Sequence, residues 1–134
     1  MEIVIDTNIL FSFFWKNSTT RKLIITSNFN IISPITALEE IDKYTHEIIK
    51  KTRLKEKEFN EELKRLKEIV KFVDKKEYFY FLKDAGKISP DKKDSDFFAL
   101  CFKYNCLFWT NDSLLKMQNK IRVLNTEEII ELLF

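Results

Sequence analysis

"EIVIDTN", residues 2–8, places a carboxylate directly after a short apolar run. The run EIVI is rich in β-branched residues, which is typical of a strand buried within a parallel sheet. Asp6 therefore stands at the end of the first expected strand, and Thr7 and Asn8 follow it at once. In open α/β sheets, ligands bind beyond the carboxyl ends of the strands. Asp6 is thus a candidate site residue, although a turn residue would occupy the same position.

Further strands and helices alternate along the rest of the chain. Strands are expected at 29–33, 106–110 and 121–124, and the run at 69–73 fits either a strand or the end of a helix. Helices are expected in the later part of 12–28, over 35–52, from about 55, over 75–87, over 97–102, from 111 and from 126. Their expected boundaries include Thr19 or Thr20 as one cap, an end near Gly86, and Thr126 as the last cap. This alternation predicts one α/β domain, residues 1–134, with a mainly parallel sheet.

The composition narrows the class of protein. With 134 residues, 45% of them hydrophobic, the chain has enough apolar volume for one packed core. A single Gly excludes glycine-rich phosphate loops, and the two cysteines lack a second Cys/His pair for a structural zinc site. The net charge of +2 gives no general basic field, so a nucleic-acid partner would depend on local patches. The chain shows neither a secretory leader pattern nor a membrane-spanning stretch, so a cytoplasmic protein is expected.

Three further acids stand in places related to that of Asp6. Asp112 lies two residues after the strand at 106–110, Asp94 at the front of the buried helix, and Glu40 on the helix after the second strand. Taken singly, each Asp is more readily interpreted as a helix cap, and Glu40, which adjoins Glu39, as a solvated helix residue. If the strands are parallel, however, all four acids converge at one edge of the sheet.

Such a group of acids has a chemical consequence. Two like charges about 4 Å apart repel by roughly 4 kcal/mol at an effective dielectric near 20, so protons or cations must compensate them. Hard oxygen ligands without His or Cys favour Mg²⁺ or Mn²⁺. Such ions activate water and stabilise the charge that builds on a phosphodiester. The acids therefore indicate hydrolysis of a nucleic-acid backbone.

The four acids, in this order, resemble the motifs of the PIN-domain nucleases. The first motif is an Asp that closes the first strand, as in VIDTNIL, and the second is a Glu before an aliphatic residue, as in TALEEIDKY. The second motif is best matched by Glu40, with Glu39 as the alternative. The third, DSDFFALC, gives Asp94 with Asp96 as a rival, and the fourth, FWTND, supplies Thr110 and Asp112. The resemblance thus extends over most of the chain.

This resemblance implies a three-layer α/β/α fold with a central mainly parallel sheet and a Mg²⁺- or Mn²⁺-dependent endoribonuclease. Asp6, Glu40 and Asp94 would coordinate the metal, and Asp112 would do so directly or through water. Supporting roles would fall to Asn8 and Thr110, which orient the acids or the water, and to the accessory acids Asp91 and Asp96. Phosphate contacts would come from Lys50, Lys51, Lys92 and Lys93.

The small size of the chain is similar to that of VapC-like toxins of toxin–antitoxin pairs, which implies RNA as substrate, a protein antitoxin and a homodimer. The charged segment at about 50–76 resembles a helical insertion found in one branch of the family. Phe11, Phe13, Phe14 and Trp15 are candidates either for a docking surface or for the core.

Two alternatives remain at this stage. A catalytically inactive PIN-like module that binds RNA or protein would be expected to lack some of the acids, yet all four are present. A phosphatase of another α/β class, such as the haloacid-dehalogenase type, needs a second Asp where this chain has Asn8. The acids therefore favour the nuclease, while the RNA target and the number of metal ions do not follow from them.

Overall fold

Five strands form one sheet at the centre of the structure, a computed structural model that describes residues 1–134. They are β1 (Glu2–Ile5), β2 (Asn30–Pro34), β3 (Val70–Val73), β4 (Leu107–Trp109) and β5 (Val123–Leu124). Their order across the sheet is β3-β2-β1-β4-β5, and every pairing is parallel. The predicted parallel sheet is therefore confirmed, and β1 lies at its centre.

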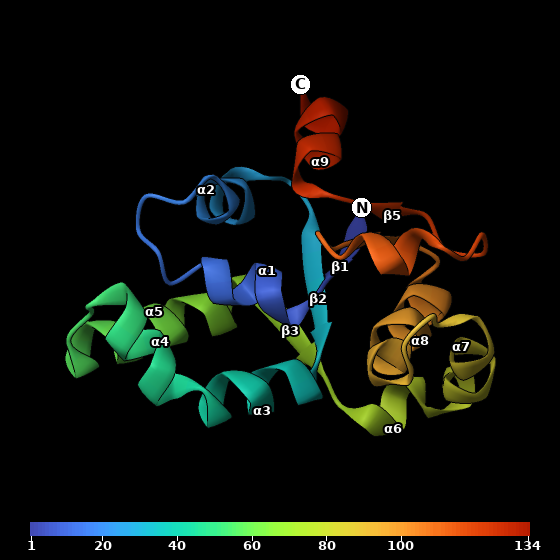
Figure 1. Cartoon of the computed structure of the whole chain (residues 1–134), viewed down its shortest axis with the longest axis horizontal. Coiled ribbons are helices and arrows are strands. Elements are labelled where there is room, and N and C mark those ends of the chain that lie inside the picture. Colours follow the sequence, from blue (N-terminus) through green and yellow to red (C-terminus); the bar gives the residue numbers. More distant parts are fainter.

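Helices cover both faces of this sheet, as the three-layer prediction requires. Figure 1 shows α1 to α5 on one side of the strands and α6 to α8 on the other. The helices are α1 (Thr7–Ser12), α2 (Thr19–Thr26), α3 (Ile35–Lys43), α4 (Thr45–Thr52), α5 (Glu56–Ile69), α6 (Lys75–Tyr78), α7 (Leu82–Ile88), α8 (Ser95–Tyr104) and α9 (Thr126–Leu133). The order of the strands reverses at β1, and such switch points are where α/β proteins place their ligands.

The core is built around β1 and α8. Ile3, Val4 and Ile5 have no exposed surface, because helices cover β1 on both faces. On one face, the rings of Phe97 and Phe108 stack with centroids 5.6 Å apart. The expected burial of the apolar helix at 97–102 is thus confirmed for most of its length. The ring stack fixes α8 against β4, the neighbour of the strand that Asp6 follows.

The segment at 69–73 is a strand. α5 ends at Ile69, and the next four residues pair with β2 as the edge strand β3. The charged segment at 50–76 therefore contributes a strand to the central sheet as well as helix to its surface.

The expected helix at 35–52 is broken into two. Tyr44 lies between α3 and α4 with φ −100° and ψ 13°, outside the helical range, although α4 begins at the next residue. The bend leaves the Tyr44 side chain partly exposed, at 37%.

The caps expected at Thr19 or Thr20 and at Thr126 lie one or two residues too late in the chain. α2 is capped by Ser18, whose hydroxyl oxygen accepts a hydrogen bond from the backbone N–H of Arg21 at 3.0 Å. Thr19 and Thr20 therefore lie inside the first turn.

At the C-terminus, α9 is capped by Asn125 rather than Thr126. The Asn125 side chain accepts a hydrogen bond from the backbone N–H of Glu128, and the Glu128 carboxylate accepts one from the Asn125 N–H. This reciprocal arrangement satisfies two donors that the start of a helix leaves free.

The sequence predicts that a helix ends near Gly86, but α7 continues to Ile88. A Cβ atom added at Gly86 would meet only the Ser95 hydroxyl oxygen, at 3.9 Å, which is an ordinary contact. Because Gly inside a helix is less favourable than Ala, Gly86→Ala is expected to increase the free energy of unfolding by about 0.5–1 kcal/mol. Urea denaturation measures this change, and a loss of stability would show that α7 and α8 need a closer approach than the structure has.

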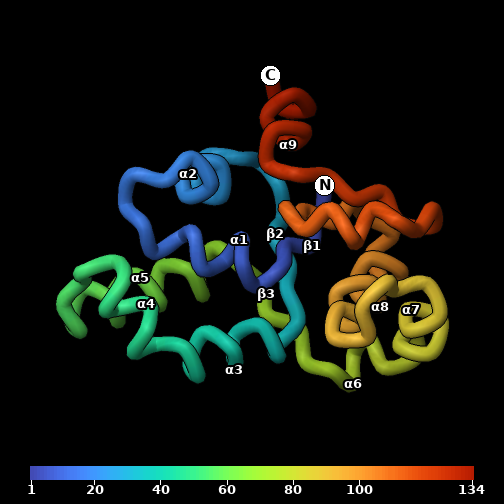
Figure 2. The backbone as a smooth tube through the Cα atoms, viewed as in Figure 1, coloured from blue at the N-terminus to red at the C-terminus, as the bar shows by residue number.

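The two chain ends lie at the same end of the sheet. Figure 2 traces the chain from its start at the central strand to its end in α9, and Met1 and Leu132 line one hollow there. The carboxyl ends of the strands point away from this region. None of the helices combines the length and the apolar composition that crossing a membrane requires.

Candidate functional site

Asp6 is held rigidly at the carboxyl end of β1. It caps α1, because its Oδ1 accepts a hydrogen bond from the backbone N–H of Ile9 at 2.9 Å. Its Oδ2 accepts a hydrogen bond from the Thr110 hydroxyl. Burial raises the pKa of Asp6, and the charge of Asp112 adds to the rise, against the hydrogen bonds, which lower it. Each carboxylate oxygen keeps a second lone pair for a ligand.

Thr110 and Asp112 follow β4, which is the neighbour of β1. The Thr110 hydroxyl donates to Asp6 and accepts a hydrogen bond from the Asp112 backbone N–H at 3.1 Å. Asp112 caps the 3₁₀-helix Ser113–Lys116 through a bond from the Leu114 N–H. The capping interpretation therefore holds for Asp112, yet its charge also acts on the site.

Asp94 differs, because its carboxylate caps nothing. It stands directly before α8, but its side chain accepts no capping hydrogen bond. Burial, together with the charges of Asp91, Asp6 and Asp112, raises the pKa of Asp94 to about 6. The capping interpretation is therefore wrong here, and Asp94 is a half-buried acid among like charges.

The two accessory acids have structural partners. Asp91 accepts a hydrogen bond from the Lys93 backbone N–H at 3.0 Å and caps the 3₁₀-helix Lys92–Asp94, which carries Asp94. Asp96 accepts a hydrogen bond from the Tyr78 hydroxyl at 2.6 Å. Asp96 thus fastens α6 to α8, while Asp94 faces the other acids.

Glu40 is not brought into this group. Glu40 and Asn8 are both exposed, and they line a hollow of about 380 Å³ beside α1, α3 and α4. Lys51 lines the same hollow, whereas Lys50 is exposed elsewhere on α4. The structure therefore gathers Asp6, Asp91, Asp94 and Asp112, with Lys92 and Lys93 next to them in the chain, and leaves Glu40 to the side.

Some features of the site did not emerge from the sequence. Ser33, at the end of β2, is fully buried and donates a hydrogen bond to the Ile5 carbonyl at 3.0 Å, which ties two strand ends together. Tyr44 lines the hollow with Glu40, four residues earlier, and its backbone N–H donates a hydrogen bond to the Glu40 carbonyl at the end of α3. That spacing was the available signal, since it places an aromatic ring beside a motif acid.

The acids fit a hard divalent cation by their chemistry. No three Asp, Glu, His or Cys side chains in the chain are close enough to hold a metal ion as they are placed. The donors are all carboxylate oxygens, however, and the like charges that raise the Asp94 pKa would be relieved by a cation. To hold one ion together, these carboxylates would have to come closer to one another than they stand.

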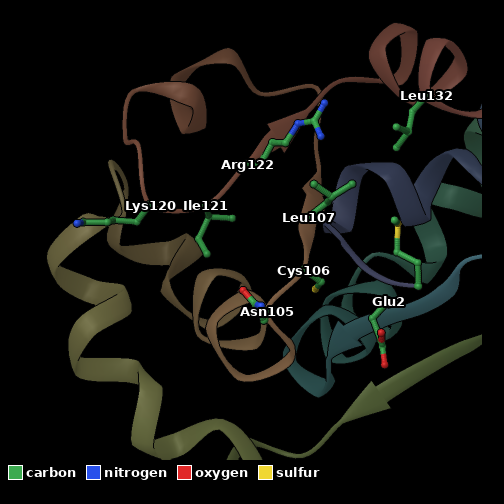
Figure 3. A pocket seen from close by; sticks show the side chains of 9 residues that line it. Glu2, Asn105, Cys106, Leu107, Lys120, Ile121, Arg122 and Leu132 are labelled. Carbon is green, nitrogen blue, oxygen red and sulfur yellow. The ribbon is translucent and has the colours of Figure 1, made fainter.

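A second hollow, also of about 380 Å³, lies at the opposite end of the sheet. Figure 3 shows Lys120 and Arg122 at this hollow, with Glu2 as its one carboxylate. Because the acids lie at the other end of the strands, the hollow in Figure 3 is not the place for the same chemistry.

Comparisons with known proteins agree with this geometry. None of the curated proteins matches the chain. Among solved structures, it is similar in fold to a chain of the VapBC2 complex from Rickettsia felis bound to a DNA fragment from their promoter. The TM-score is 0.66 and the identity 15%, over 93% of this chain and 98% of that one. The family model of the PIN domain matches residues 4–132, so this chain belongs to the PIN-domain family.

Proposed function

We propose that this protein is a metal-dependent endoribonuclease. The observation that carries the proposal is the Asp94 carboxylate, which is half-buried, accepts no capping hydrogen bond and lies among three other acids. A protein gains no stability from such an arrangement, so a ligand is the physical reason to keep it. PIN domains are typically nucleases, which gives the ligand its chemistry.

The proposed roles follow from how each side chain is held. Asp6 and Asp94 would be metal ligands, Asp112 would ligate directly or through water, and Glu40 is the remaining candidate ligand. Thr110 fixes the Asp6 carboxylate from the neighbouring strand. Bound Mg²⁺ or Mn²⁺ would supply an activated water and neutralise charge on the phosphodiester. Lys92 and Lys93 are exposed beside the acids and would contact RNA phosphates.

A toxin role is part of the proposal. The similar solved chain belongs to a VapBC2 complex and is matched over 98% of its length, so no large addition separates the two folds. We therefore propose a cytoplasmic toxin that a protein antitoxin controls, acting as a homodimer. Co-expression with a small partner encoded beside it would test this part.

The first test is metal-dependent cleavage. Single-stranded RNA is expected to be cut with Mn²⁺ or Mg²⁺ and to remain intact with EDTA. Metal that binds only the folded chain is also expected to increase the free energy of unfolding, by about 2.7 kcal/mol when the metal is in hundredfold excess over its Kd. The melting temperature is therefore expected to rise. Thermal denaturation with and without metal measures this rise. RNA binding without cutting would instead identify an inactive binding module, and cutting in EDTA would exclude a metal enzyme.

A further inference from the structure

The hollow that Glu40 and Asn8 line has an aromatic wall. We call it the aromatic hollow and define it by Phe11, Trp15 and Tyr44, which contribute to its lining together with the two polar residues. The rings of Phe11 and Tyr44 meet edge to face, with centroids 6.1 Å apart and an interplanar angle of 79°. This contact fixes the orientation of the Tyr44 ring at the bend between α3 and α4.

Two aromatic side chains of the hollow are exposed to solvent, whereas the neighbouring rings of Phe13 and Phe14 are buried. Trp15 and Tyr44 are 38% and 37% exposed, whereas Phe13 and Phe14 have no exposed surface. The four aromatic residues at 11–15 therefore divide: two belong to the core, and Phe11 and Trp15 contribute to a surface cavity. Exposed aromatic faces that line a cavity are suited to stacking on a flat ring.

The charges around the aromatic hollow select the kind of ligand. Two carboxylates, those of Glu40 and Glu47, line it, and the one lysine of the lining, Lys51, lies 3.9 Å from Glu47. The Lys43 ammonium also lies over the Tyr44 ring, 5.5 Å from its centroid, so the acids outnumber the lysines only within the lining itself. The one lysine of that lining is shared with Glu47, so the hollow offers a phosphate no cluster of free cations. A neutral ring with N–H donors would instead stack on the aromatic wall and donate hydrogen bonds to the acids.

The aromatic hollow also adjoins the acids of the site. Asn8 lines it and lies two residues after Asp6, within the first turn of α1. A chain that crosses the acids with its phosphates would therefore bring a neighbouring group to this cavity.

We infer that the aromatic hollow binds one unpaired nucleobase of single-stranded RNA, next to the phosphodiester that the acids would cut. This inference rests on the proposed function and names its substrate more closely. Bases with an exocyclic amino group, such as adenine, would donate hydrogen bonds to the carboxylates of Glu40 and Glu47. Base-paired RNA has its bases stacked inside the duplex and does not fit.

The binding test uses the full chain carrying Asp94→Asn, in EDTA, so that the slowed, metal-dependent cleavage does not consume the RNA. Of the two tryptophans, Trp109 is fully buried, so Trp15 dominates any change in fluorescence caused by a surface ligand. The adenosine octamer rA8 is expected to quench this fluorescence, and an octamer of abasic ribose-phosphate is expected not to do so. Equal quenching by both would mean that phosphate, not a base, is bound, and would overturn the inference.

Variants localise the base. With labelled rA8 and anisotropy as the readout, Trp15→Ala and Tyr44→Ala are each expected to raise the Kd about ten- to hundredfold, as the loss of one stacked base does. The matched control is Tyr80→Ala, because Tyr80 is 94% exposed and lies outside the hollow. Melting temperatures close to that of the parent chain verify that the variants fold.

Cleavage by chains with an intact Asp94 separates the two claims. Trp15→Ala is expected to raise the KM for RNA more than it lowers kcat, because it removes binding rather than chemistry. An unchanged Kd and KM would overturn the inference while the nuclease stands, and would point to protein docking at this surface. If Trp15→Ala weakened rA8 binding while the chain with an intact Asp94 cut no RNA with any metal, the aromatic hollow would be a base-binding site. The proposed nuclease function would then be wrong.

Discussion

Replacing Asp94 by Asn is expected to lower the rate of metal-dependent RNA cleavage by about a hundredfold to a thousandfold. The amide cannot serve as an anionic metal ligand, and the charge that the site needs for a cation is reduced. The same substitution is expected to stabilise the metal-free chain. Burial and three like charges raise the pKa of Asp94 from 3.8 to about 6, so the ionised form is disfavoured in the folded state.

The gain in stability has a defined pH range. The folded chain binds the proton of the Asp94 carboxyl more tightly than the unfolded chain does. Ionisation of Asp94 therefore destabilises the fold, with no effect below about pH 4 and the full effect above about pH 6. Asp94 is only half-buried, so solvent screening reduces the gain to about 1 kcal/mol, a few degrees in melting temperature. Thermal denaturation in EDTA at pH 4 and pH 7 measures it. If the parent chain and Asp94→Asn had equal melting temperatures at pH 7, the ionised Asp94 would not destabilise the fold.

Asp96→Asn is the matched control, because Asp96 lies two residues further along the chain, in the first turn of α8. The Asp96 carboxylate accepts the Tyr78 hydroxyl at 2.6 Å, so weakening this bond is expected to lower stability by about 1–2 kcal/mol and to change cleavage much less. The two neighbouring variants thus have opposite expected effects on stability and unequal effects on activity. If Asp96→Asn abolished cleavage while Asp94→Asn did not, the third acid would be Asp96.

Replacing Arg21 by Met is expected to lower the free energy of unfolding by about 3 kcal/mol, or the melting temperature by roughly 10 °C. The Arg21 guanidinium lies 2.6 Å from the Glu62 carboxylate, with side chains only 8% and 15% exposed. It also donates to the Phe13 carbonyl at 2.7 Å. Its removal therefore leaves a buried carboxylate and a buried carbonyl without this partner, and loosens α5 from α2.

Two controls separate this pair from ordinary surface charge. The double variant Arg21→Met with Glu62→Leu is expected to recover much of the lost stability, because no charge is then left unpaired. Glu58, on α5 like Glu62, pairs with Lys16 at 3.1 Å, but the side chains of Lys16 and Glu58 are 54% and 38% exposed. Lys16→Ala is therefore expected to cost less than about 1 kcal/mol. Chemical denaturation measures the free energy of unfolding of each variant. If Lys16→Ala and Arg21→Met lowered it equally, burial of the Arg21–Glu62 pair would not be the cause of the loss.

The order of strands and helices followed from the sequence because apolar runs of the right length and composition form this sheet. The finer boundaries did not follow. Val70–Val73 has a pattern that suits helix and strand alike, and only its pairing with β2 decides. Ser18, Thr19 and Thr20 are all able to cap a helix, so the choice depends on the path of the preceding loop. The bend at Tyr44 has no proline or glycine to mark it.

The positions of the acids were foreseen only in part. Asp6 was placed by the end of its strand, which is a strong local signal. Asp94 and Asp96 are two residues apart, and their different partners depend on where α6 docks, which no local pattern encodes. Glu40 was grouped with the other acids from the order of motifs, but its side chain lies at the aromatic hollow, because helix rotation sets its direction.

The hydrogen bond between Thr110 and Asp6 joins residues 104 positions apart in the chain. A growing polypeptide carries Asp6 long before Thr110, and the Thr110 hydroxyl can orient Asp6 only after β4 has been made and has paired with β1. Shorter N-terminal fragments therefore lack this support, whether they are nascent or produced by proteolysis. For a protein proposed to cut RNA, this arrangement postpones the assembled site until β4 has been made and has joined the sheet.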